Sequence, residues 1–209
     1  MYTLFISKIS KLLDLNPWEL QSEYEADVFR REFNIRLPKD HTFFRQDIVL
    51  PGLKHELKPI RNPIMRKKMI QCSDRCTFGI ENENVVLSHL IDRNGWNITS
   101  QQKLVRYKLS ERWMLTGKID GIREYDRGGG RLLEVKCRVG GWAGVRENEL
   151  IQVQLYLLST GFKSCLFVEA YRNLVKAHTI QRNEDYIAIL VEAIHELTHH
   201  IDLARDRLG

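Results

Sequence analysis

Residues 132–138 constrain the fold of this chain more than any other part of its sequence. They read Leu-Leu-Glu-Val-Lys-Cys-Arg, which places a carboxylate, Glu134, two residues before an ammonium group, Lys136. Because successive side chains of a β-strand point to opposite faces, these two share one face of the predicted strand. Burying such a pair costs free energy unless further charges or a metal ion compensate. We therefore expect a strand with a charged site on one face.

The opposite face of the same strand is expected to fill a hydrophobic core. It would present, in order, Leu133, Val135, Cys137 and Val139.

A second extended segment, residues 115–121, precedes that strand and carries a further carboxylate, Asp120. The Gly-rich residues 126–130 separate the two segments and predict a turn, so the segments are expected to be neighbours. Asp120 and Glu134 could then ligate a hard divalent cation through their oxygens. Lys136 would lie beside a water molecule bound to that cation. In outline, this arrangement suits cleavage of a phosphodiester bond.

Composition places the chain among ordinary globular proteins. With 209 residues, 43% of them hydrophobic and 28% charged, it is expected to form a single domain over residues 1–209. No apolar run approaches the length of a membrane span, and residues 1–8 lack a signal-peptide pattern. The four cysteines are too few for a disulfide framework and are expected to be reduced thiols, with a metal cluster as the alternative. An intracellular location, in the cytoplasm or nucleus of a host cell, follows.

Hydrophobic periodicity, glycines and capping residues predict the order of the elements. Helices are expected over residues 2–14, 16–34, 74–94, 147–160 and from 183 onward, and strands over 104–109, 113–122, from 132, 164–171 and 174–181. This order predicts an α/β or α+β fold, with a central mixed β-sheet flanked by helices. Within it, residues 1–70 would form a helical and irregular N-terminal extension, 75–181 the catalytic core and 183–209 a C-terminal packing helix.

The chemistry-bearing residues together resemble a known superfamily. Asp120, then Glu134-x-Lys136, then Gln152-x-x-x-Tyr156 on the next helix is similar to the motif series of PD-(D/E)XK nucleases. More narrowly, it resembles their lambda-exonuclease and RecB-like branch, which includes YqaJ-type proteins and viral alkaline nucleases. The resemblance covers roughly residues 75–171.

Two further positions bear on this resemblance. Gly79 and Glu83 match a Gly-x-x-x-Glu motif on a helix before the sheet, as in that branch. Ile119 departs from the pattern, because many members of the superfamily have proline before the aspartate.

The resemblance implies a restriction-endonuclease-like core and a nuclease that depends on Mg²⁺ or Mn²⁺. Asp120 and Glu134 would be catalytic and would ligate the metal together with the carbonyl of Val135 and with Glu83. Lys136 would orient the attacking water or help to deprotonate it. The residues expected to contact the substrate are Gln152, Tyr156, Arg138, Arg146, Lys67 and Lys68.

Several structural alternatives stay open at this point. Gln152 and Tyr156 would serve equally well in hydrogen bonds between helix and sheet, and Glu83 as a solvated carboxylate. The basic residues 61–68 suit either a solvated helix face or phosphate contacts. Trp142, in the loop after the charged strand, would be either a wedge against DNA or part of the core.

The resemblance favours an exonuclease that acts on duplex DNA ends in recombination, repair or viral DNA processing. A structure-specific or single-strand endonuclease is the alternative within the same class. An inactive nucleic-acid-binding protein, or an interaction protein of a recombination complex, is the alternative from another class. The net charge of +5 mildly favours an anionic partner such as DNA. A single-strand annealing protein and a homo-oligomer are further expected partners.

A competing motif, His195-Glu-Leu-Thr-His199, matches the HExxH signature of zinc proteases. Its histidines would lie one helical turn apart, which permits zinc binding. Asp202 continues the same face but would be an unusual third ligand at this spacing. The apolar stripe through Ile194, Leu197 and Ile201 favours a core-packing helix with the histidines at its edge.

Overall fold

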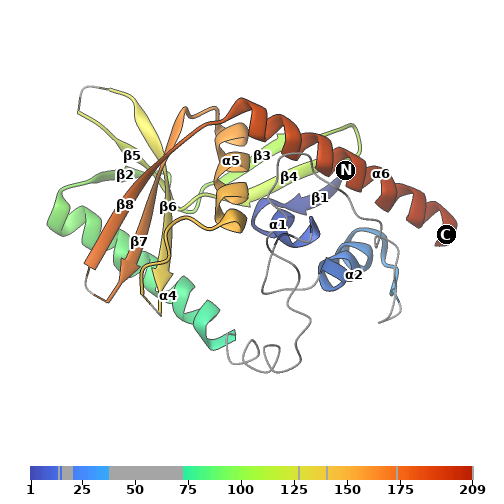
Figure 1. Cartoon of the computed structure of the whole chain (residues 1–209), viewed down its shortest axis with the longest axis horizontal. Coiled ribbons are helices and arrows are strands. Elements are labelled where there is room, and N and C mark those ends of the chain that lie inside the picture. The colour runs from blue at the N-terminus through green and yellow to red at the C-terminus, as the bar shows by residue number, and fades with distance from the viewer. Residues whose placement is uncertain are drawn as a thin grey trace. The chain divides into compact units, whose positions relative to one another are not determined.

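The computed structural model describes residues 1–13, 15, 21–37, 73–126, 128–139, 141–172 and 174–208, without the side chains of 73–81 (Figure 1). The chain divides into two compact units. The first unit comprises Met1–Ile60, Arg106–Gly117 and Asn183–Gly209, and the second comprises Arg61–Val105 and Lys118–Arg182. The predicted boundaries of extension, core and packing helix stay predictions. Within the described ranges, no helix is long and apolar enough to cross a membrane.

The first unit joins a three-stranded sheet to helices from both ends of the chain. The sheet has the order β1-β4-β3. Its described elements are β1 (Tyr2–Phe5), the 3₁₀ helix η1 (Ile6–Lys8), α1 (Ile9–Leu12), α2 (Gln21–Phe33), β3 (Leu104–Lys108), β4 (Trp113–Lys118) and α6 (Glu184–Leu208).

The expected helix over residues 2–14 is wrong at its start. Tyr2–Phe5 is a strand that pairs in parallel with β4, and the Tyr2 N–H donates to the Arg112 carbonyl at 2.6 Å. In so short a segment, the apolar positions fit a strand as well as a helix, so periodicity alone does not decide. The partner strand, more than a hundred residues away in sequence, decides instead.

The second unit contains a mixed five-stranded sheet of order β2-β5-β6-β7-β8. Only β6 and β7 pair in parallel, and the other neighbours are antiparallel. Its elements are α4 (Ser73–Asn94), β2 (Asn97–Thr99), β5 (Gly121–Glu124), β6 (Gly130–Arg138), α5 (Glu147–Thr160), β7 (Ser164–Tyr171) and β8 (Leu174–Gln181). The expected mixed sheet with helices is confirmed, while β2 was not expected.

Helix α4 runs along one face of this sheet (Figure 1). Its Leu87 and Leu90 pack in one buried cluster with side chains from β2, β6 and β7, namely Ile98, Leu133, Val135, Leu166 and Val168. The predicted apolar face of β6 therefore exists. It is shorter than expected, because Cys137 is only partly buried and Val139, beyond the end of the strand, is 48% exposed.

The chain changes sheets between β4 and β5, where one continuous strand over residues 113–122 was expected. β4 ends at Lys118 in the first sheet, and β5 begins at Gly121 in the second. Gly121 is required here, since a Cβ would lie 2.8 Å from the Ile98 side chain and 3.3 Å from the Thr99 carbonyl oxygen. Asp120 therefore stands at the entry to the second sheet.

Helix ends follow the capping residues in the sequence. Gly161 ends α5 in the left-handed conformation with φ of 75°, as expected for glycine after a helix. At the start of α6, the Asn183 side-chain oxygen accepts the Tyr186 N–H at 3.0 Å. Asn183 therefore caps the N-terminus of α6, where a helix was expected from residue 183.

Replacing this N-cap should destabilise the protein measurably. We expect Asn183→Ala to lower the free energy of unfolding by about 1 kcal/mol, because an N–H of the first turn loses its acceptor. Asn183→Asp, which keeps an acceptor at the N-cap, should stay close to the wild type. Urea unfolding followed by circular dichroism measures both, and equal stability of the three proteins would contradict a capping role.

Candidate active site

The register between β5 and β6 brings Asp120 to Glu134. Gly121, the first residue of β5, pairs with Leu133, and the two strands are antiparallel. Asp120, just before Gly121, therefore stands opposite Glu134, just after Leu133. Here the Asp120 side chain takes the place of a backbone carbonyl acceptor, since its Oδ2 accepts the Val135 N–H at 2.7 Å. Both carboxylates are buried. The two segments singled out in the sequence thus meet as expected.

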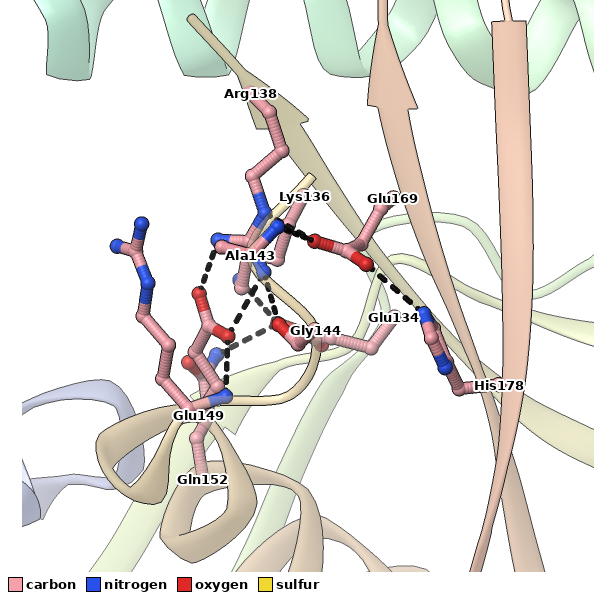
Figure 2. Close-up of polar contacts among 10 residues, drawn as sticks. Glu134, Lys136, Arg138, Ala143, Gly144, Glu149, Gln152, Glu169 and His178 are labelled. Carbon is pink, nitrogen blue, oxygen red and sulfur yellow. Dashed lines mark hydrogen bonds and ion pairs between the residues drawn. The ribbon is translucent and has the colours of Figure 1, made fainter. Parts of the chain in front are cut away.

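Glu134 is held from two directions. The Lys136 Nζ donates to its Oε1 in an ion pair, and the Gln152 Nε2 donates to the same oxygen at 2.9 Å (Figure 2). The other oxygen, Oε2, is buried and has no hydrogen-bond partner among the described residues. A buried carboxylate oxygen without a partner is costly, so this atom is a candidate ligand for a cation.

Gln152 and Tyr156 tie α5 to the strands of the site. The Tyr156 hydroxyl donates to the Lys118 carbonyl at 2.7 Å, and the Gln152 Nε2 lies 3.5 Å from that hydroxyl. The alternative of helix-to-sheet hydrogen bonds therefore describes Tyr156 well. Gln152 combines such a bond with direct contact to Glu134.

Negative charge exceeds positive charge at this site. Burial and, second, the charge of Asp120 raise the pKa of Glu83 to about 7 and that of Glu134 to about 8, although Lys136 opposes both shifts. Burial also raises the pKa of Asp120. Burial disfavours the ammonium of Lys136, but Glu134 and Asp120 outweigh it and raise the Lys136 pKa. One ammonium thus stands among three carboxylates.

The residues present fit a hard divalent cation. Within the described chain, no three His, Cys, Asp or Glu side chains are already grouped as metal ligands. The unpartnered Glu134 Oε2 is nevertheless a buried oxygen donor whose charge a hard cation would neutralise. Such donors suit Mg²⁺ or Mn²⁺. Asp120, Glu134, Glu83 and the Val135 carbonyl stay the predicted ligands.

A second buried network of charged side chains lies next to the site, and it was not predicted from the sequence. Arg138 donates from Nη1 to Glu149 Oε1 at 2.6 Å and from Nε to Glu169 Oε1 at 2.7 Å. Glu169 also pairs with His178 at 2.8 Å (Figure 2). Glu169, in the otherwise apolar strand Ser164–Tyr171, was the sequence signal for this network. As for Glu134, a carboxylate in such a strand requires a compensating charge.

This network favours the ionised form of Glu169. Burial opposes ionisation, but the Ala143 N–H and the side chains of Arg138 and His178 together lower the Glu169 pKa. Glu149 and Glu169 thus both form ion pairs with the guanidinium of Arg138. Arg138 was expected to contact a substrate phosphate, and its guanidinium contacts these two glutamates instead.

The other predicted contacts are placed as follows. The Arg146 side chain is exposed, and Lys67 and Lys68 lie outside the described residues. Cys137 and Cys165 are free thiols, as expected, while Cys72 and the side chain of Cys76 are not described.

The HExxH motif lies on a helix, as expected. His195 and His199 are exposed on α6. Asp202 contacts other groups, because its Oδ2 accepts the Trp113 Nε1–H at 3.2 Å and its Oδ1 lies 3.7 Å from Arg205. These contacts favour the interpretation of α6 as a packing helix.

Comparison with solved structures identifies proteins of the same fold. An alkaline exonuclease from Laribacter hongkongensis, LHK-Exo, matches with a TM-score of 0.62 and 15% identity, over 99% of this chain and 91% of that one. A structure of LHK-Exo in complex with dAMP matches with a TM-score of 0.58 and 16% identity, over 98% and 92%. A phage-related exonuclease from Haemophilus somnus 129PT matches with a TM-score of 0.52 and 10% identity, over 99% and 96%.

No protein-family model matches the sequence, and no curated protein matches it significantly. The chain therefore has the fold of these exonucleases, and the expected nuclease-like architecture is confirmed.

Removing the arginine of the second network should destabilise the protein strongly. We expect Arg138→Met to lower the free energy of unfolding by about 3–5 kcal/mol, because Glu149 and Glu169 stay buried without their cation. Arg106→Met, at an exposed position of β3, is the matched control and should change stability by less than about 0.5 kcal/mol. Chemical denaturation gives both values. A loss for Arg138→Met no larger than that of the control would contradict the ion-pair account.

Proposed function

We propose that this protein is a nuclease that hydrolyses phosphodiester bonds of DNA with the help of Mg²⁺ or Mn²⁺. The observation that carries the proposal is the convergence of Asp120, Glu134 and Lys136, with Gln152 in contact with Glu134. The exonuclease fold supports it independently.

The site offers what phosphodiester hydrolysis requires. A divalent cation held by Asp120 and Glu134 would supply charge neutralisation at the phosphate and a more acidic water. The Lys136 ammonium, in an ion pair with Glu134, would orient the attacking water and stabilise negative charge on the phosphorane. Gln152 fixes the Glu134 carboxylate through its amide N–H. Burial of the carboxylates strengthens each of these electrostatic effects.

The proposed substrate is a DNA end, and the proposed setting is recombination, repair or viral DNA processing. Both named neighbours are exonucleases, and one structure of LHK-Exo contains dAMP. A structure-specific or single-strand endonuclease is the second candidate. The intact set of Asp120, Glu134 and Lys136 argues against an inactive binding protein. A single-strand annealing partner and a homo-oligomer belong to the same proposal.

Degradation of end-labelled linear DNA tests the proposal directly. We expect linear duplex DNA to be shortened from its ends with Mg²⁺ or Mn²⁺ and to stay intact with EDTA. Closed circular DNA should stay intact with either, because it has no end. Cleavage of the circle would support the endonuclease, and no cleavage of any DNA with either metal would reject the proposal.

Single substitutions in the site should remove activity without unfolding the protein. We expect Asp120→Asn, Glu134→Gln and Lys136→Met each to lower the cleavage rate by about 100- to 1,000-fold or more, because each removes a group that acts on the transition state. Glu192→Gln, at an exposed position of α6, is the control and should retain full activity.

Thermal unfolding of the same variants separates catalysis from folding. We expect midpoints close to that of the wild type for Asp120→Asn and Glu134→Gln, since neutralising either carboxylate relieves repulsion. Lys136→Met should unfold at a lower temperature, because Glu134 stays buried without its ion-pair partner, so its cleavage rate is measured below that midpoint. Wild-type cleavage rates in any of the three site variants would reject the assigned roles.

A further inference from the structure

An aromatic pair, of an exposed tryptophan and a partly buried tyrosine, lies where the charged strand leaves the sheet. Trp142 follows β6, and its side chain is 42% exposed. Its ring packs edge to face against Tyr171, the last residue of β7, with ring centroids 5.9 Å apart. This exposure argues against a core position for Trp142, because a core tryptophan would be buried. Of the two alternatives, the contact with DNA is left.

The loop that carries Trp142 is held by hydrogen bonds at the residues that follow the tryptophan. The Ala143 N–H donates to Glu169 Oε1 at 3.1 Å, and Arg138 Nη2 donates to the Gly144 carbonyl at 2.8 Å (Figure 2). The Arg146 N–H donates to Glu149 Oε2 at 3.0 Å. Because these acceptors and donors belong to the buried charge network, the loop holds Trp142 in one position at little further cost in entropy.

The register of β6 and β7 relates this pair to the site. Tyr171 of β7 pairs with Arg138 of β6, and Lys136 lies on β6 two residues before Arg138. Two residues of a strand span about 7 Å. Successive nucleotides of a stacked strand are about 3.4 Å apart, so this distance corresponds to about two nucleotides. A strand cut beside Lys136 would thus pass the aromatic pair within a few nucleotides of the scissile bond.

Positive charge accompanies the aromatic surface. The Arg172 guanidinium carbon lies 5.2 Å from the centroid of the Tyr171 ring, and both Arg172 and the Arg146 side chain are exposed. Aromatic rings beside cationic side chains are the usual means of binding a single nucleic-acid strand, because bases stack on the rings while phosphates meet the cations. The same charges would disfavour a cationic or purely apolar protein partner.

We infer that Trp142 and Tyr171 form a stacking platform for a base of an unpaired segment in the strand that is being cut. This inference rests on the proposed nuclease function and adds a binding subsite to it. The platform fixes the strand relative to Lys136 without reading its sequence, since every base has a face that can stack.

Binding of labelled DNA without metal tests this platform apart from catalysis. The probe is a fluorescein-labelled oligodeoxythymidylate, and its anisotropy is measured in EDTA with the full-length protein. We expect Trp142→Ala to weaken binding about fivefold or more, and Trp142→Phe to retain most of the affinity. Phe5→Ala, an aromatic position of similar exposure at 38%, is the matched control and should leave binding unchanged.

A series of probes that each lack one base locates the contact. In the wild type, we expect one or two adjacent positions at which loss of the base weakens binding severalfold. In Trp142→Ala, loss of the same bases should have no further effect, because the ring on which they stack is absent. Equal losses in both proteins, or no sensitive position in the wild type, would overturn the platform.

Two outcomes separate this inference from the proposed function. If the wild type cleaves DNA but Trp142→Ala binds it as tightly, only the platform is rejected. If the wild type neither binds nor cleaves DNA, both proposals are rejected. A change in sedimentation for Trp142→Ala, with unchanged DNA affinity, would assign the exposed ring to a protein contact and would overturn the inference.

Discussion

The candidate site depends on the hydrogen bond from the Val135 N–H to the Asp120 carboxylate. This bond continues the ladder between β5 and β6 to the residue just before Gly121, the first residue of β5. It therefore fixes one carboxylate by the same interaction that fixes the sheet. Glu134 follows on the paired strand, and Lys136 follows two residues later on the same face. A change of register by one residue would turn Glu134 and Lys136 into the hydrophobic layer under α4 and would eliminate the site.

Much of the second unit could be predicted from the sequence, because its elements have strong local signals. The ends of α5, β7 and β8 agree with the expected bounds, since glycine stops the helix and a continuous apolar run marks β7. The pairing of Asp120 with the charged strand was also predictable, because the intervening turn is short. The first strand, Tyr2–Phe5, was not predictable in this way, because its partner lies more than a hundred residues later.

The site was predicted less completely than the fold around it. Glu134, Lys136 and Gln152 contact one another as the motif implied. Arg138 was expected to contact the substrate, but its side chain forms ion pairs with two buried glutamates. Sequence spacing places residues on a face, but it does not show which of several partners a long side chain reaches. Glu149 and Glu169 come from two different elements, α5 and β7, so their convergence on Arg138 is a tertiary effect. The same limitation applies to Trp142, whose exposure depends on where that convergence holds its loop.

The buried network around Arg138 also constrains how this protein can evolve. One guanidinium pairs with both Glu149 and Glu169, and these three residues come from three different elements, β6, α5 and β7. Loss of Arg138 leaves two buried glutamates without their cation, and loss of either glutamate removes one of the two ion pairs of the guanidinium, so the cost of a second change depends on whether the first has occurred. Among descendants of this sequence, the three positions should therefore change as a set or stay fixed. Exposed loop positions other than Trp142 are free of that dependence and can diverge one at a time.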